Sequence, residues 1–153
     1  MKWNPTEGNK LGVQTAVLEG DPSKPGFYVT INHFPPGVMS RPHTHPDERN
    51  CVVLKGTWYT GEGREFAPKT TVGLKPGSYM RHPSGGLHYD GALDEDVWVM
   101  ISGYGPTRAD VIGGGELFGP CSVVFGHHGI PFGRNLSVGE SGRMPGIAAC
   151  GIG

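Results

Sequence analysis

Short apolar runs, interrupted at close intervals by glycine and proline, form the main pattern along the chain. In the first clear run, Phe27, Val29 and Ile31 alternate with more polar residues, which is the period of a half-buried β-strand. Runs of this kind predict strands at Phe27–His33, Asn50–Lys55, Thr57–Tyr59, Thr71–Leu74, Ser78–Arg81, Val97–Ser102 and Cys121–Phe125. Almost no segment keeps a helical period over ten residues, so the pattern predicts an all-β domain.

Turn-forming residues separate the predicted strands. Pro35-Pro36-Gly37, Pro76-Gly77 and Pro83-Ser84-Gly85-Gly86 supply residues suited to sharp or positive-φ backbone. Many short strands at this spacing are typical of a β-sandwich or a jelly-roll barrel.

Composition agrees with one compact β domain. The chain has 153 residues, the size of a single typical domain. Hydrophobic residues make up 36% and charged residues 18%, both below the usual values of about 45–50% and about 25%. The 27 glycines and 14 prolines account for the difference. Because they separate apolar runs, we interpret them as turns and not as low-complexity sequence.

Charge and hydropathy indicate which partners and which cellular compartments to expect. The formal net charge is −1, with no cluster of lysine and arginine, which argues against a nucleic-acid partner. No apolar stretch approaches the roughly 18 residues of a spanning helix, and no signal-peptide core follows Met1. We expect a soluble chain without a membrane partner, cytoplasmic as given, or periplasmic or secreted if a signal peptide has been removed.

The three cysteines do not suggest a disulfide framework. Cys51, Cys121 and Cys150 are odd in number and scattered in spacing, whereas disulfide-stapled domains carry paired cysteines at regular spacings. We therefore expect buried, reduced thiols.

The main chemical signal is the pair of histidines in His43-Thr44-His45. Histidines at i and i+2 of a strand point to one face, so both imidazoles can reach the same metal ion. His88, on a separate stretch, would complete three ligands, the usual number at a catalytic metal that keeps an open position. Imidazole binds Fe, Mn, Ni, Cu and Zn alike. The expected cofactor is thus one divalent transition metal of undetermined identity.

Glycine and proline frame these histidines in a pattern that resembles the cupin superfamily. The first cupin motif (Gly, five residues, HxH, three or four residues, Glu, six residues, Gly) aligns with Gly37, His43, His45 and Gly56. The second (Gly, five residues, PxG, two residues, His) aligns with Gly77, Pro83, Gly85 and His88. The resemblance, to small single-domain cupins, implies a double-stranded β-helix or jelly-roll barrel around a metal pocket. It does not name a substrate.

The extent of the resemblance divides the chain into three parts. Residues 27–104 form the expected cupin barrel with both motifs. Residues 1–26 are expected to pack on the barrel as an N-terminal segment. Residues 105–153 form a glycine-rich extension with one strand, expected to wrap the barrel or a dimer partner.

One position departs from the cupin pattern: Arg49 stands where the motif places its glutamate ligand. A guanidinium stays protonated and cannot bind a cation. In one interpretation, Glu48 turns inward through a bulge and supplies a fourth, carboxylate ligand. In the other, three histidines and water hold the metal while Arg49 faces an anion, either a substrate carboxylate or Asp90. Strand alternation favours the second, because it places Arg49 inside and Glu48 outside.

Other polar residues lie near the histidine motifs. Tyr89 and Asp90 directly follow His88 and are candidate proton donors or acceptors. His82 and His33 match no ligand position, so surface or pocket-rim positions are expected for both.

These observations predict a metal-dependent enzyme acting on a small, anionic organic substrate that Arg49 orients. Its chemistry would be oxidative, as in a dioxygenase, or of the lyase or isomerase type. The alternatives are a non-catalytic module that binds a metal or small ligand, and a dimer whose metal braces the barrel. A cavity of roughly several hundred cubic ångströms at the metal favours the enzyme, and a closed four-ligand shell favours the brace. A homodimer is expected because cupins often pair through sheet edges.

Overall fold

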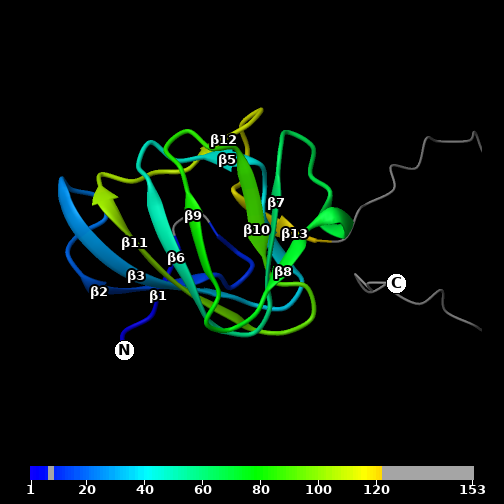
Figure 1. Ribbon diagram of the computed structural model, residues 1–153, viewed down its shortest axis with the longest axis horizontal. Coiled ribbons are helices and arrows are strands. Elements are labelled where there is room, and N and C mark those ends of the chain that lie inside the picture. Colours follow the sequence, from blue (N-terminus) through cyan, green and yellow to red (C-terminus); the bar gives the residue numbers. More distant parts are fainter. Residues whose placement is uncertain (7–8, 122–153) are drawn as a thin grey trace, which may run out of the picture.

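The computed structural model of the protein describes residues 1–6 and 9–121, and its regular structure there is almost entirely β-strand (Figure 1). The elements are β1 (Asn4–Pro5), β2 (Gln14–Glu19), β3 (Gly26–Phe34), β4 (Val38–Ser40), β5 (His43–Thr44), β6 (Arg49–Lys55), β7 (Trp58–Glu62), the 3₁₀ helix η1 (Pro68–Thr70), β8 (Val72–Leu74), β9 (Tyr79–His82), β10 (His88–Gly91), β11 (Val97–Gly105), β12 (Asp110–Val111) and β13 (Phe118–Pro120). Within the described ranges, no helix is long and apolar enough to cross a membrane.

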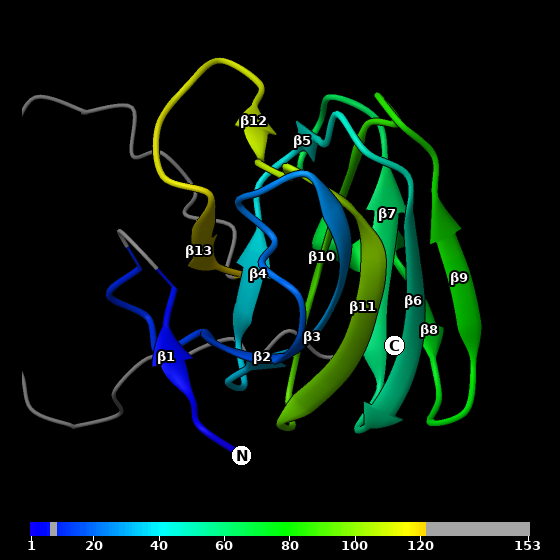
Figure 2. The same cartoon turned by 90° about the vertical axis from the view of Figure 1, so that its left-hand side faces the viewer.

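Two antiparallel sheets form the jelly-roll barrel that the sequence predicts. The first has the strand order β1-β2-β3-β11-β6-β9. The second runs β12-β5-β10-β4-β13, with β7 paired to β10 and β8 paired to β7. Strands β5 and β12 lie together at one end of the barrel in both views (Figures 1 and 2). At this end of the barrel, β5 pairs with both β12 and β10. This pairing brings the side chains of these strands together.

Six of the seven predicted strands are present, as β3, β6, β7, β8, β9 and β11. The seventh, Cys121–Phe125, lies outside the described residues except for Cys121, which is not in a strand. The strands that the sequence did not predict are short or polar; β10, for example, reads His-Tyr-Asp-Gly. β2, the longest of them, pairs with β3, so the segment before residue 27 contributes a strand to the first sheet.

Alternation along the long strands builds the core between the sheets. In β6, Arg49, Cys51 and Val53 are buried while the residues between them are not. The buried core cluster comprises Val13, Tyr28, Phe34, Val38, Cys51, Val53, Trp58, Ala92, Val97, Val99 and Ile101. Two members of this cluster, Phe34 and Ile101, also line the small cavity that contains His43 and His45.

The buried positions of β3 do not follow its apolar pattern: Tyr28 and Thr30 are buried, as is Ile31 of the apolar set. Tyr28 is 1% exposed, whereas Phe27 is 43% exposed and packs on Tyr104 outside the sheet. The reason is polar: the Tyr28 hydroxyl donates a 2.7 Å hydrogen bond to Oδ2 of Asp47. The strand was predicted correctly, but its apolar alternation does not mark a single buried face.

Two motif glycines offer a test of the turns that frame the site. Gly56 and Gly77 both have positive φ, 72° and 87°, which costs a residue with a Cβ about 1–2 kcal/mol. A Cβ at Gly56 would also collide with the carbonyl oxygen of Asp96, whereas one at Gly77 would meet nothing within 4 Å.

We therefore expect Gly77→Ala to lower the free energy of unfolding by about 1–2 kcal/mol and Gly56→Ala to lower it substantially more, because its backbone must move. Urea denaturation of both variants measures the difference. Equal losses would show that the contact with Asp96 is irrelevant.

Candidate metal centre

Three imidazoles meet inside the barrel at the β5 end. His43 on β5 and His88 on β10 are direct partners across an antiparallel pair, and His45 follows β5. The three residues are between 3% and 7% exposed. Their ring centroids are 4.4–5.5 Å apart, and one ligand atom from each lies within 4.8 Å of the others. The structure thus brings together the three histidines singled out in the sequence.

Backbone carbonyls fix the orientation of each ring. Nδ1 of His43 lies 2.7 Å from the Arg41 carbonyl oxygen, and Nδ1 of His45 lies 2.6 Å from that of Arg108. Nδ1 of His88 makes the same contact with Gly86, at 2.9 Å. A carbonyl oxygen only accepts, so each Nδ1 must carry the hydrogen, and each Nε2 of a neutral ring keeps its lone pair.

Burial keeps these rings neutral. It lowers the pKa of both His43 and His88 from 6.5 to about 4. Burial also lowers the pKa of His45, and the nearby Arg49 adds to that effect. At neutral pH the three rings are therefore in the form that binds metal without first releasing a proton.

The donor set fits a divalent transition metal. His45 Nε2 is buried and has no hydrogen-bond partner, an arrangement that native interiors avoid unless a ligand completes it. A cavity of about 50 Å³ lies beside His43, His45, Arg49 and Asp90, enough for an ion and a few water molecules. Three nitrogen donors held by backbone carbonyls, with space left over, correspond to an open metal site and not to a closed shell.

Arg49 points inward and Glu48 outward, as strand alternation predicts. Glu48 is exposed and its Oε2 lies 3.5 Å from Nη1 of Arg81, so it does not supply a fourth ligand. Arg49 is 8% exposed, and its Nη2 lies 3.4 Å from both His82 Nδ1 and His88 Nε2. Among the described residues, no carboxylate lies within 4.0 Å of it.

Asp90 shares the inward face of His88. Its Oδ2 lies 3.7 Å from Nε2 of His88, and burial raises the pKa of its carboxyl group. Ser40 donates to the Asp90 backbone carbonyl oxygen and accepts from its backbone N–H, which fixes this part of β10.

Tyr89 is not brought into the cluster. Alternation along β10 turns it to the opposite face, where it packs against Phe66 and its hydroxyl donates to the Ala67 carbonyl oxygen at 3.2 Å. Tyr89 is therefore a packing residue of a second core cluster and not a proton donor or acceptor beside the histidines.

His82 lies in the site although it matches no ligand position, and it lines a pocket there, one of the two places expected for it. It is buried and not on the surface; its ring stacks on that of His88 at a centroid distance of 3.6 Å, and its Nε2 has no hydrogen-bond partner. The predicted strand ended at Arg81, one residue short, and so hid its position directly opposite Arg49. His33, by contrast, lies away from the cluster and contacts Asp96 at 2.7 Å.

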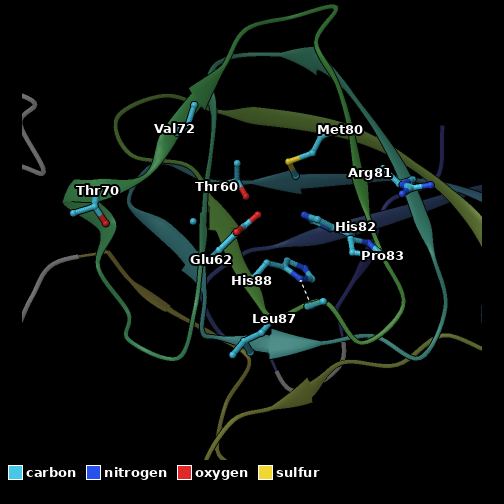
Figure 3. Close-up of a pocket in the computed structure, with 12 residues that line it drawn as sticks. Thr60, Glu62, Thr70, Val72, Met80, Arg81, His82, Pro83, Leu87 and His88 are labelled. Atoms are coloured by element: carbon cyan, nitrogen blue, oxygen red, sulfur yellow. Dashed lines mark hydrogen bonds between the residues drawn. The ribbon is translucent and has the colours of Figure 1, made fainter.

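A larger pocket reaches His88, one of the three predicted ligands, from the side of His82. It has a volume of about 520 Å³ and is lined by His82 and His88 among other residues. Figure 3 shows these two rings side by side, with Thr60 and Glu62 of β7 across from His82. A cavity of this size at the cluster meets the condition that favours an enzyme or ligand-binding site over a structural brace.

Comparison with known proteins places the chain among cupins. The profile of a family described as the ChrR cupin-like domain matches residues 1–108. The chain is similar to DMSP lyase DddQ from Ruegeria pomeroyi DSS-3, with 21% identity, a TM-score of 0.58, and coverage of 72% of this chain but only 60% of the lyase. It is also similar to the polyketide cyclase RemF from Streptomyces resistomycificus, with 18% identity, a TM-score of 0.60, and coverage of 72% and 79% respectively.

A third similar structure is KdgF from Halomonas sp., with 22% identity, a TM-score of 0.55, and coverage of 71% of this chain and 90% of that one. Comparison with curated sequences finds no match. At these identities the structural likeness concerns the fold.

The buried histidines predict a specific loss of stability in acid. Between pH 6.5 and about 4 the unfolded chain protonates His43 and His88 while the folded chain does not. The free energy of unfolding of the metal-free protein should therefore fall as the pH falls through this window, by roughly 1 kcal/mol per pH unit for each such histidine.

Urea unfolding in EDTA at pH 7.5, 6.5 and 5.5 measures this slope, which should be shallower in His43→Gln. A free energy that is the same at pH 7.5 and 5.5 would show that these rings are not held neutral by burial.

Proposed function

Because this chain belongs to the ChrR cupin-like family, we propose that it is a metal-dependent enzyme acting on a small, anionic organic molecule. His43, His45 and His88 hold one divalent transition metal. The observation that carries the proposal is Arg49, a buried guanidinium with no carboxylate partner among the described residues, next to three neutral nitrogen donors.

The three imidazoles suit Fe(II), Mn(II), Ni(II), Cu(II) or Zn(II). A bound ion of this kind supplies a Lewis acid for a substrate oxygen. The protein contributes the fixed direction of the three Nε2 atoms, since each ring is held through Nδ1 by a backbone carbonyl. Holding ligands in place in this way supports metal affinity.

Arg49 supports an anionic ligand. A buried charge is costly unless it is paired, and a guanidinium binds carboxylates bidentately. The small cavity beside Arg49 has room for the anionic group, and the 520 Å³ pocket at His82 and His88 has room for the organic part.

Non-oxidative chemistry is the first reaction class to test. Asp90 and His82 place titratable groups beside the donors, and proton transfer is what lyases and isomerases require of such groups. Two of the similar structures are named as a lyase and a cyclase. Oxidative chemistry would use the same metal and the same three histidines, so the metal site does not distinguish the two reaction classes.

A non-catalytic binding module is the alternative, and one observation favours it. Arg49 replaces the carboxylate of the cupin pattern, and its Nη2 lies 3.4 Å from His88 Nε2. The positive charge of Arg49 repels a metal ion that is bound by three neutral imidazoles, and so weakens its binding. A bound anion would offset this repulsion in either function.

The metal prediction concerns protein purified without an affinity tag or added metal. Elemental analysis should find about one equivalent of a transition metal, and His88→Ala should reduce it to a small fraction. His33→Ala, which removes a histidine outside the cluster, should leave it unchanged. Wild-type protein without metal, or a His88→Ala variant that retains it, would contradict the proposal.

Arg49→Ala should keep its metal but bind acetate at least about tenfold more weakly, because a charge-assisted pair to Arg49 is lost. NMR titration with acetate measures this, with acetamide as the neutral probe whose affinity should not change. Arg49→Lys keeps the charge and should fall between. If Arg49→Ala instead loses the metal, Arg49 organises the donors and does not recognise an anion.

A further inference from the structure

A second set of potential donors lies beside the first. His82, His88 and Asp90 are all buried, and one ligand atom from each lies within 4.8 Å of the others. The rings of His82 and His88 are stacked, and Asp90 Oδ2 lies 3.7 Å from His88 Nε2. We propose that these three residues form a second binding position for a divalent transition metal, which shares His88 with the first.

The strand register explains how His82 reaches the site. Arg49 on β6 and His82 on β9 are direct partners, so their side chains leave the sheet on the same face. His82 thus brings a nitrogen donor to the place where the cupin pattern carries a carboxylate and this chain carries Arg49. His82 Nε2 is buried without a partner, and such an atom is rare in a native interior unless a ligand completes it.

The charge of the second set also suits a cation. The first set consists of three neutral imidazoles, whereas the second includes the carboxyl group of Asp90, whose ionised form a bound cation would favour. Two histidines and one carboxylate form a common donor set for zinc. Ionised in this way, Asp90 would offset the repulsion that Arg49 exerts on an ion nearby.

The two positions are alternatives, because an ion bound at either one uses His88. Nδ1 of His88 is bonded to the Gly86 carbonyl, so Nε2, which lies 3.4 Å from Arg49 Nη2, is the one nitrogen of this ring that either position can use. His82 and His88 both line the 520 Å³ pocket (Figure 3). Two of the three ligands of the second position therefore belong to the wall of this pocket. This inference deepens the proposed function, because it concerns the same metal and the same pocket.

Cobalt(II) titration of metal-free protein tests the second set, because the visible absorption of cobalt reports both binding and geometry. The double variant His43→Ala/His45→Ala removes the first set and leaves the second. It should bind one cobalt ion at least about tenfold more tightly than the triple variant that adds His82→Ala. Adding Met80→Ala to the double variant is the matched control, since Met80 lines the same pocket from the same strand and should not matter.

Equal cobalt affinity in the double and triple variants would overturn the second set. If circular dichroism shows that the double variant does not fold, the wild type is compared with His82→Ala alone, whose cobalt spectrum should differ. Identical spectra and affinities would also overturn it. Wild-type protein that binds no cobalt would contradict the proposed function itself.

Discussion

The site depends on one constraint: each of three buried imidazoles gives its N–H to a backbone carbonyl and turns its lone pair inward. The carbonyls belong to three separate segments, at Arg41, Gly86 and Arg108. Polar contacts hold these segments in turn; Asp47 accepts hydrogen bonds from the hydroxyls of Tyr28 and Thr107, next to the Arg108 carbonyl. The barrel therefore supplies rigid, neutral donors, and their convergence makes metal chemistry possible.

Much of the fold followed from the sequence because alternation and turn residues are local signals. The strands β6 and β11 showed their period directly, and the inward direction of Arg49 followed from strand alternation with His45 and Gly56 as fixed points. The strand β10 was not predicted, because its inward residues, His88 and Asp90, are polar residues of the site. In β3, Tyr28 is buried and Phe27 is exposed, with the Tyr28 hydroxyl bonded to Asp47, and no local rule anticipates a contact between residues 19 positions apart.

The candidate site was predictable as far as the motif extended. The three histidines have a motif with fixed spacing, whereas His82 is defined only by its cross-strand neighbour Arg49. Cross-strand register is a property of the assembled sheet, so the sequence could not reveal it. The same two residues distinguish this chain from the cupin pattern: a guanidinium stands at the ligand position, and an additional imidazole lies beside it. In the proposed function, a bound anion balances the positive charge at this point.

The most direct test of the account is the protonation state of the three rings. Long-range ¹H–¹⁵N NMR on histidine-labelled, metal-free protein at neutral pH should show His43, His45 and His88 as neutral rings with the hydrogen on Nδ1, and one equivalent of zinc should shift their Nε2 signals. Rings that carry the hydrogen on Nε2, or Nε2 signals that zinc leaves unchanged, would contradict the convergence of lone pairs on which the metal centre depends.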